Sequence, residues 1–152
     1  MAVTLVAICA LVLLLIVLRI KHMKDRQEME QHTITPDALY ILLVSNQDVP
    51  VFDVRLPLDL LADSEIIPGA KRLSPQEVLE NPSLIPNEKD TVVYCTCPSD
   101  ETSRAILRRA LAIGFLRVKF LKGGLAGWKA KGYPVEPYEK PFHLDTGTSL
   151  RT

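Results

Sequence analysis

The chain begins with an unbroken apolar segment. From Ala2 to Leu18 the sequence reads AVTLVAICALVLLLIVL, without a single charged side chain. A helix rising about 1.5 Å per residue would extend roughly 26 Å over this run, close to a hydrocarbon core of about 30 Å. Ile20 and the long basic side chains that follow supply the remaining length. We therefore predict one transmembrane helix over residues 1–20, with residues 2–20 contacting the membrane.

The charges that follow this segment predict its orientation. Arg19, Lys21, Lys24 and Arg26 come directly after the apolar run, in a charged and helix-prone stalk over residues 21–31. A cleavable signal peptide is the alternative. It would have basic residues before the apolar run and a small-x-small site after it, and this sequence has neither. Because positive charge collects on the cytoplasmic side of a span, we expect an uncleaved single-pass anchor with the C-terminal domain in the cytoplasm.

The rest of the chain has the size of one domain. The protein has 152 residues, and 18 basic side chains balance 18 acidic ones. This balance gives no field that would attract nucleic acid, so we expect no nucleic-acid partner. We predict a single folded domain over residues 32–137 and a polar tail over residues 138–152.

Short apolar runs alternate with helical patterns along this domain. The expected strands lie within residues 49–54, 67–73, 91–95 and 117–121. The expected helices lie within residues 36–43, 56–63, 74–82, 105–114 and 125–132. The run TVVYC at 91–95 is apolar on both faces, which is typical of a strand in the middle of a parallel sheet. The pattern predicts a compact α/β domain with a parallel sheet.

Two cysteines, Cys95 and Cys97, stand at the end of that central strand, within VVYCTCPSDETSRAIL. In parallel α/β folds, ligands bind at the carboxyl ends of strands, where the next helix presents free N–H groups and the positive end of its dipole. A thiol at this place can have its pKa lowered, so Cys97 is a candidate sulfur nucleophile. The alternative is a buried thiol in a domain that has the fold without the activity.

Two other kinds of cysteine site fit the sequence poorly. A metal site needs about four ligands, and the domain has no second cysteine pair or histidine cluster, so we expect no metal. A Cys-x5-Arg phosphatase would need arginine at Ser103. Arg104 is one residue too far, which on a helix is a rotation of roughly 100°.

Several short motifs, taken in order, resemble the rhodanese-like domain. They are DVR at 53–55, IPGA at 67–70, the strand, cysteine loop and helix at 92–114, GGLAGW at 123–128, and GYPVE after it. Together they span most of the chain after the stalk. The resemblance implies a central parallel five-stranded sheet flanked by helices, preceded here by the transmembrane helix.

The resemblance also implies which cysteine reacts. In the family, a six-residue loop separates the reactive cysteine from the helix body, and counting back from GF at 114–115 leads to Cys97 without a gap. Cys97 would then be the catalytic, persulfide-forming residue. The substrate-binding loop, whose amides would hold the outer sulfur, matches Pro98, Ser99, Asp100, Glu101, Thr102 and Ser103.

The implied activity is sulfur transfer without a cofactor. The Cys97 thiolate takes a sulfane sulfur from a small donor, and the persulfide passes it to a thiol or cyanide acceptor. Asp100 and Glu101 would repel a dianion such as thiosulfate, although acids also favour a helix N-terminus. The alternative hypothesis is that the protein is not an enzyme. It would then be a catalytically inactive rhodanese-like module that binds a partner or senses redox state at the membrane.

The remaining candidate residues have mainly structural interpretations. Cys95 is either a core thiol or a resolving cysteine, since it shares a strand face with Cys97. Asp53 and Arg55 resemble the fold-supporting pair of the family. Gly123 and Gly124 are expected to form a turn with positive φ, and Trp128 is expected to be in the core.

Overall fold

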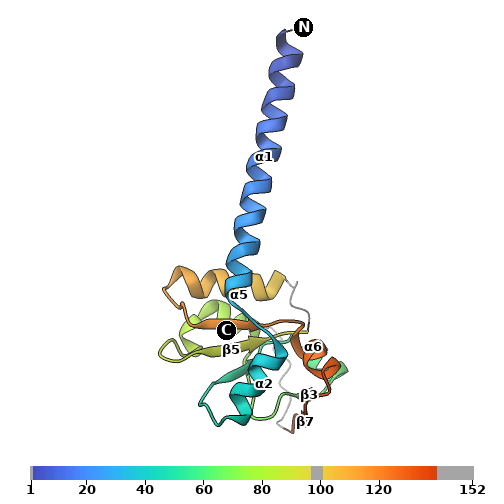
Figure 1. The fold of residues 1–152 in the computed structure, drawn as a ribbon, viewed down its shortest axis with the longest axis vertical. Helices are drawn as coiled ribbons and strands as arrows, with labels where there is room; N and C mark the ends of the chain where they lie inside the picture. Colours follow the sequence, from blue (N-terminus) through green and yellow to red (C-terminus); the bar gives the residue numbers. More distant parts are fainter. Residues whose placement is uncertain (1, 97–100, 140–152) are drawn as a thin grey trace, which may run out of the picture. The chain divides into compact units, whose positions relative to one another are not determined.

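The computed structural model describes residues 2–96 and 101–139, with side chains described for all of these except 2–5 and 101–104. The chain divides into two compact units, residues 1–33 and residues 34–152. Figure 1 shows the course of the chain.

The first unit is one long helix. Helix α1 covers Ala2–Gln31, so the apolar run and the charged stalk are continuous. Among the described residues, one helix is long and apolar enough to cross a membrane, over Val6–Gln31 with a mean hydropathy of 2.3 in its most apolar part. Length and composition make α1 a candidate membrane span.

The second unit contains a five-stranded sheet in the order β1-β6-β5-β2-β4. The strands are β1 (Thr33–Ile34), β2 (Val51–Asp53), β4 (Lys71–Arg72), β5 (Thr91–Tyr94) and β6 (Val118–Leu121). Strand β5 lies in the middle of the sheet and pairs in parallel with β2 on one side and β6 on the other. All of its residues are buried, as expected for a strand that is covered on both faces. The predicted α/β fold with a parallel sheet is confirmed.

Helices cover both faces of the sheet (Figure 1). They are α2 (Pro36–Val44), α3 (Pro57–Ala62), α4 (Pro75–Glu80), α5 (Glu101–Ala112) and α6 (Gly124–Ala130), with a 3-10 turn η1 at Pro82–Leu84. Local signals explain several of their starts. The Thr35 hydroxyl accepts a hydrogen bond from Ala38 N at the start of α2. Ser74 and Glu77 form a capping box at the start of α4.

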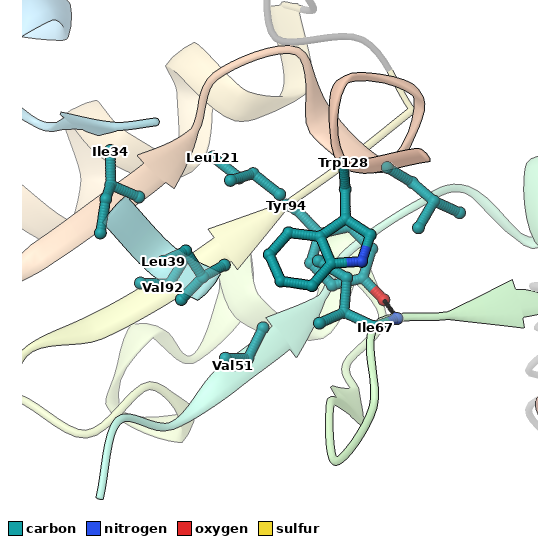
Figure 2. Packing of buried hydrophobic residues seen from close by; sticks show 9 residues of the cluster. Ile34, Leu39, Val51, Ile67, Val92, Tyr94, Leu121 and Trp128 are labelled. Atoms are coloured by element: carbon teal, nitrogen blue, oxygen red, sulfur yellow. Dashed lines mark hydrogen bonds between the residues drawn. The ribbon is translucent and has the colours of Figure 1, made fainter. Parts of the chain in front are cut away.

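Alternate strand residues form the core on one face. Figure 2 shows Val51, Val92 and Tyr94 packed with side chains from α2 and α6. Trp128 lies at the centre of this cluster with no exposed surface, and its indole N–H donates to Pro134 O at 2.8 Å. Phe52 and Val93, the neighbours of Val51 and Val92 in the chain, point to the opposite face because side chains alternate along a strand.

A second, two-stranded sheet was not predicted. Strands β3 (Glu65–Ile66) and β7 (Glu136–Pro137) pair antiparallel, and Tyr138 N donates to Ser64 O at 2.8 Å just beyond them. This small sheet joins the segment after α3 to the segment after α6.

The core on the α2 face yields a prediction about stability. Leu39→Ala removes a side chain with no exposed surface, and we expect it to lower the free energy of unfolding by about 2–5 kcal/mol. The control is Ile41→Ala on the same helix, where the side chain is 60% exposed and the change should stay within about 0.5 kcal/mol. Trp128 is the single tryptophan of the chain, so its fluorescence in urea reports unfolding of this domain in the full-length protein. Equal effects of the two substitutions would contradict this description of the core.

Candidate active site at the carboxyl edge of the sheet

The carboxyl ends of β2 and β5 lie side by side. Asp53 is level with Tyr94 in the register of the two strands, and Val54 N donates to Tyr94 O at 2.9 Å. The next residues along the two chains are Arg55 and Cys95. Parallel α/β folds bind their ligands at this edge of the sheet. The residues that follow β5 therefore lie where a ligand-binding site is expected.

The predicted reactive segment is only partly described. Cys95 is 3% exposed, just past the last residue of β5, and Thr96 is exposed. Cys97, Pro98, Ser99 and Asp100 lie outside the described residues. Glu101, Thr102 and Ser103 form the first turn of α5, and their side chains are not described. The described residues on either side of this segment are therefore Thr96 and the first turn of α5.

Asp53 and Arg55 form an ion pair inside the domain. Their side chains are 1% exposed, and Arg55 Nη2 donates to Asp53 Oδ2 at 2.6 Å. Arg55 Nε contacts both carboxylate oxygens at 2.9 and 3.0 Å, and Arg55 N donates to Oδ1 at 2.9 Å. Two further bonds of the guanidinium run from Nη1 to Asp63 O and from Nη2 to Glu65 O, both at 2.8 Å. These contacts support a structural role, because the guanidinium is occupied by protein acceptors around β2, α3 and β3.

Burial and hydrogen bonding act in opposite directions on Arg55. Burial lowers the pKa of the guanidinium, but the hydrogen bonds and charge of Asp53 outweigh it and raise the pKa above its usual value. Arg55 therefore remains a cation beside the buried Asp53 side chain.

Tyr94 completes the network, and the sequence interpretation did not single it out. Its hydroxyl donates to Asp53 Oδ2 at 3.1 Å and accepts from Ile67 N at 3.2 Å (Figure 2 shows the second bond). Burial, together with the charge of Asp53, raises the pKa of the Tyr94 phenol far above its usual value, so the hydroxyl keeps its proton. A tyrosine within a fully buried strand signals such a network, since a buried hydroxyl needs a partner.

Helix α6 lies against the other side of the β5 end. Gly123, which precedes α6, and Gly124, its first residue, both have positive φ, 80° and 54°. Leu125 N, in the first turn of α6, donates to Cys95 O at 3.2 Å. The end of β5 is therefore held by β2 and its ion pair on one side and by α6 on the other. Within residues 2–96 and 101–139, no group of three His, Cys, Asp or Glu side chains is placed to hold a metal ion.

The family of this chain follows from comparison with known proteins. A family model described as the rhodanese-like domain matches residues 35–131. The chain belongs to the rhodanese-like domain family. A sulfurtransferase of Allochromatium vinosum is 29% identical over 102 residues, which cover 67% of this chain and 92% of that protein. The domain thus has a sulfurtransferase-like fold, and the resemblance inferred from the sequence motifs is confirmed.

Solved structures share this fold. The crystal structure of a rhodanese-related protein of Thermoplasma volcanium has 25% identity and a TM-score of 0.57, covering 69% of this chain and 97% of that chain. A full-length protein of Lactobacillus plantarum has 22% identity and a TM-score of 0.66, covering 78% of this chain and 98% of that chain. The second likeness concerns the fold alone.

The buried ion pair yields a prediction for stability. Arg55→Ala leaves the Asp53 carboxylate buried without its cation, and we expect a loss of about 3–5 kcal/mol in the free energy of unfolding. The matched control is Arg117→Ala, which removes an exposed pair with Asp90 and should cost less than about 1 kcal/mol. Urea titration followed by Trp128 fluorescence measures both. A similar small loss for both variants would show that the buried network contributes little.

Proposed function

We propose that this protein is a membrane-anchored sulfurtransferase that carries a sulfane sulfur as a persulfide on Cys97. The observation that carries the proposal is the place of residue 97 in a rhodanese-like domain. It comes two residues beyond Cys95, which follows the central strand, and four residues before α5 begins at Glu101. A strand end that leads directly into a helix start provides a nucleophile with backbone amides and a positive helix end nearby in the chain.

The transfer takes place in two displacements. The Cys97 thiolate attacks the outer sulfur of a donor R–S–S⁻, the S–S bond of the donor breaks, and RS⁻ leaves. An acceptor thiolate or cyanide then attacks the outer sulfur of the Cys97 persulfide, and the Cys97 thiolate is released. Covalent catalysis divides one difficult displacement into two easier ones. No external oxidant, reductant or cofactor is needed, because each step exchanges one S–S bond for another bond to sulfur.

Backbone groups are the proposed source of anion stabilisation. The first amides of an α-helix have no acceptor within the helix, and in α5 these amides belong to residues 101–104. Together with the backbone N–H groups of Ser99 and Asp100, they constitute the proposed cradle for the outer sulfur, to which Pro98 contributes no donor because it lacks a backbone N–H. Twelve residues make α5 long enough for an appreciable dipole.

The charges near this edge favour a monoanionic organic persulfide, R–S–S⁻, over the dianion thiosulfate as the donor. Asp100 and Glu101 are acidic residues of the loop and would repel a dianion. Arg55 is only 2% exposed, and its guanidinium donates to Asp53 and to the carbonyls of Asp63 and Glu65, so it is not accessible to a substrate. We therefore propose a thiol as the physiological acceptor and a small persulfide as the donor.

Cys95 is proposed to be a core thiol. A resolving cysteine has to reach the persulfide on Cys97, whereas the Cys95 residue is 3% exposed and its carbonyl is engaged by Leu125 N. Resolution through Cys95 would require the end of β5 to open.

Mass spectrometry of the full-length protein after incubation with polysulfide tests the transfer. We expect the wild type and Cys95→Ala to gain the mass of one sulfur atom, and Cys97→Ala to gain none. Thiosulfate, a dianion, should load the wild type more slowly than a monoanionic alkyl persulfide R–S–S⁻ does. Absence of the adduct with every donor would leave the alternative, an inactive module that binds a partner or senses redox state at the membrane.

We also propose that α1 anchors the domain with its C-terminal side in the cytoplasm. The support is the apolar composition of residues 2–20 and the basic residues Arg19, Lys21, Lys24 and Arg26 that follow. On this proposal residues 1–20 span the membrane, residues 21–31 form the stalk, residues 32–137 form the domain, and residues 138–152 form a polar tail.

Cysteine labelling tests this topology. In a chain whose native cysteines are replaced by alanine, a membrane-impermeant maleimide should label Ala2→Cys in intact cells. It should label Thr152→Cys only after permeabilisation. Deletion of residues 2–20 should release the protein from the membrane pellet. Labelling of Thr152→Cys in intact cells would reverse the proposed orientation.

A further inference from the structure

The first residues of α6 pass unusually close to the chain that leaves β5. A Cβ atom placed on Gly124 would lie 2.2 Å from Cys95 O, 3.1 Å from Thr96 O and 3.2 Å from Cys95 C. All three neighbours are backbone atoms, so no side-chain rotation relieves the collision. Leu125 N donates to the same Cys95 O at 3.2 Å. The backbones of the two segments are therefore in direct contact just before residue 97.

The close contact with the β5 end requires glycine at position 124 for a reason other than its positive φ. Gly69, Gly114 and Gly132 have φ of 76°, 82° and 74°, yet a Cβ on any of them would meet nothing within 4 Å. A Cβ on Gly123 would meet Gly127 Cα at 2.8 Å, within α6 itself. Among the glycines described, Gly124 is the one whose added Cβ would meet the segment leading to Cys97.

Helix α6 is firmly packed, so a side chain added at position 124 would move the end of β5 and not α6. Leu125 is 2% exposed and Trp128 is completely buried with its indole hydrogen-bonded to Pro134 O. A Cβ on Gly127 would lie 2.8 Å from Lys122 O, which shows that α6 is also packed closely against the end of β6. On the other side, the ladder between β5 and β2 reaches Tyr94, and Cys95 and Thr96 lie beyond it. A side chain at position 124 would thus displace the Cys95–Thr96 peptide.

We infer that Gly124 is a positioning residue for Cys97. Because it has no side chain, the backbone of α6 can support the Cys95–Thr96 segment and set the direction in which the chain enters residue 97. The inference depends on the proposed function, since it assigns Gly124 a part in the sulfur transfer at Cys97. Cys97 is bonded to Thr96, so a shift of that segment would move the Cys97 thiol relative to the proposed amide cradle.

Gly124→Ala and Gly132→Ala are a matched pair of variants to test this inference. Both place alanine at positive φ, but only the first adds a collision with the Cys95 carbonyl. The measurement is the rate of Cys97 persulfide formation from polysulfide between pH 6 and 10, with full-length protein. Rates are normalised to the folded fraction given by Trp128 fluorescence.

We expect Gly124→Ala to slow persulfide formation by about ten- to a hundredfold at neutral pH, because small misplacements of reacting groups cost this much. The midpoint of its pH profile should also move upward, since the displaced thiolate loses its stabilising amides. Gly132→Ala should keep the wild-type rate and midpoint for the folded fraction. A purely structural role of Gly124 would change the folded fraction and leave the midpoint in place.

A second variant decides the question if Gly124→Ala does not fold. Replacing the Leu125 amide with an ester removes the donor to Cys95 O without adding an atom that could collide. This variant should also show a slower reaction and a higher midpoint. Wild-type rate and midpoint in a folded Gly124→Ala, or in the ester variant if Gly124→Ala does not fold, would overturn the inference. Absence of persulfide on the wild type would instead overturn the proposed function.

Discussion

The burial of the Asp53–Arg55 ion pair is the constraint on which the carboxyl edge of this sheet depends. Two charges can be removed from water only when each finds its partners inside the protein. Here the guanidinium is shared between the Asp53 carboxylate and the carbonyls of Asp63 and Glu65, and Tyr94 supplies a further donor to the carboxylate. The network links the exits of β2 and β5 to the segment that leads into β3. A change in any of these segments would leave a buried charge or carbonyl without its partner.

The proposed chemistry requires that the chain leading to Cys97 be held in a fixed position. A persulfide is useful only if its thiolate form is stabilised, and stabilisation by amides depends on where the sulfur is held. The ion-pair network fixes β5 up to Tyr94, and α6 supports Cys95 and Thr96 through Leu125 N and the bare backbone of Gly124. The two supports come from segments far apart in the sequence and converge on the residues before Cys97. In this arrangement Arg55 supports the carboxyl edge of the sheet through protein contacts while being too buried to bind a substrate.

Local patterns were sufficient to predict most of the fold. The apolar run of β5 indicated a central buried strand, and Thr35, Ser74 and the prolines after them indicated helix starts at α2 and α4. The β3–β7 sheet was not predicted, because strands of two residues have no periodicity and their partners are about seventy residues apart. The 3-10 turn η1 at Pro82–Leu84, which follows α4, was not predicted either. In the site, positive φ at Gly124 was predictable from the glycine pair, but its contact with Cys95 O arises from tertiary packing. The partners of Arg55 beyond Asp53 are backbone carbonyls, which a motif of side chains in the sequence cannot predict.

The central claim is that the Cys97 thiol ionises below its usual range in the folded protein. The most direct test is the pH dependence of Cys97 alkylation in the full-length chain, with the reactivity of Cys97→Ala subtracted to remove the contributions of Cys9 and Cys95. The account predicts a midpoint at or below about pH 7.5 for wild-type protein. A midpoint at or above about 8.5, the value of an ordinary cysteine, would contradict it.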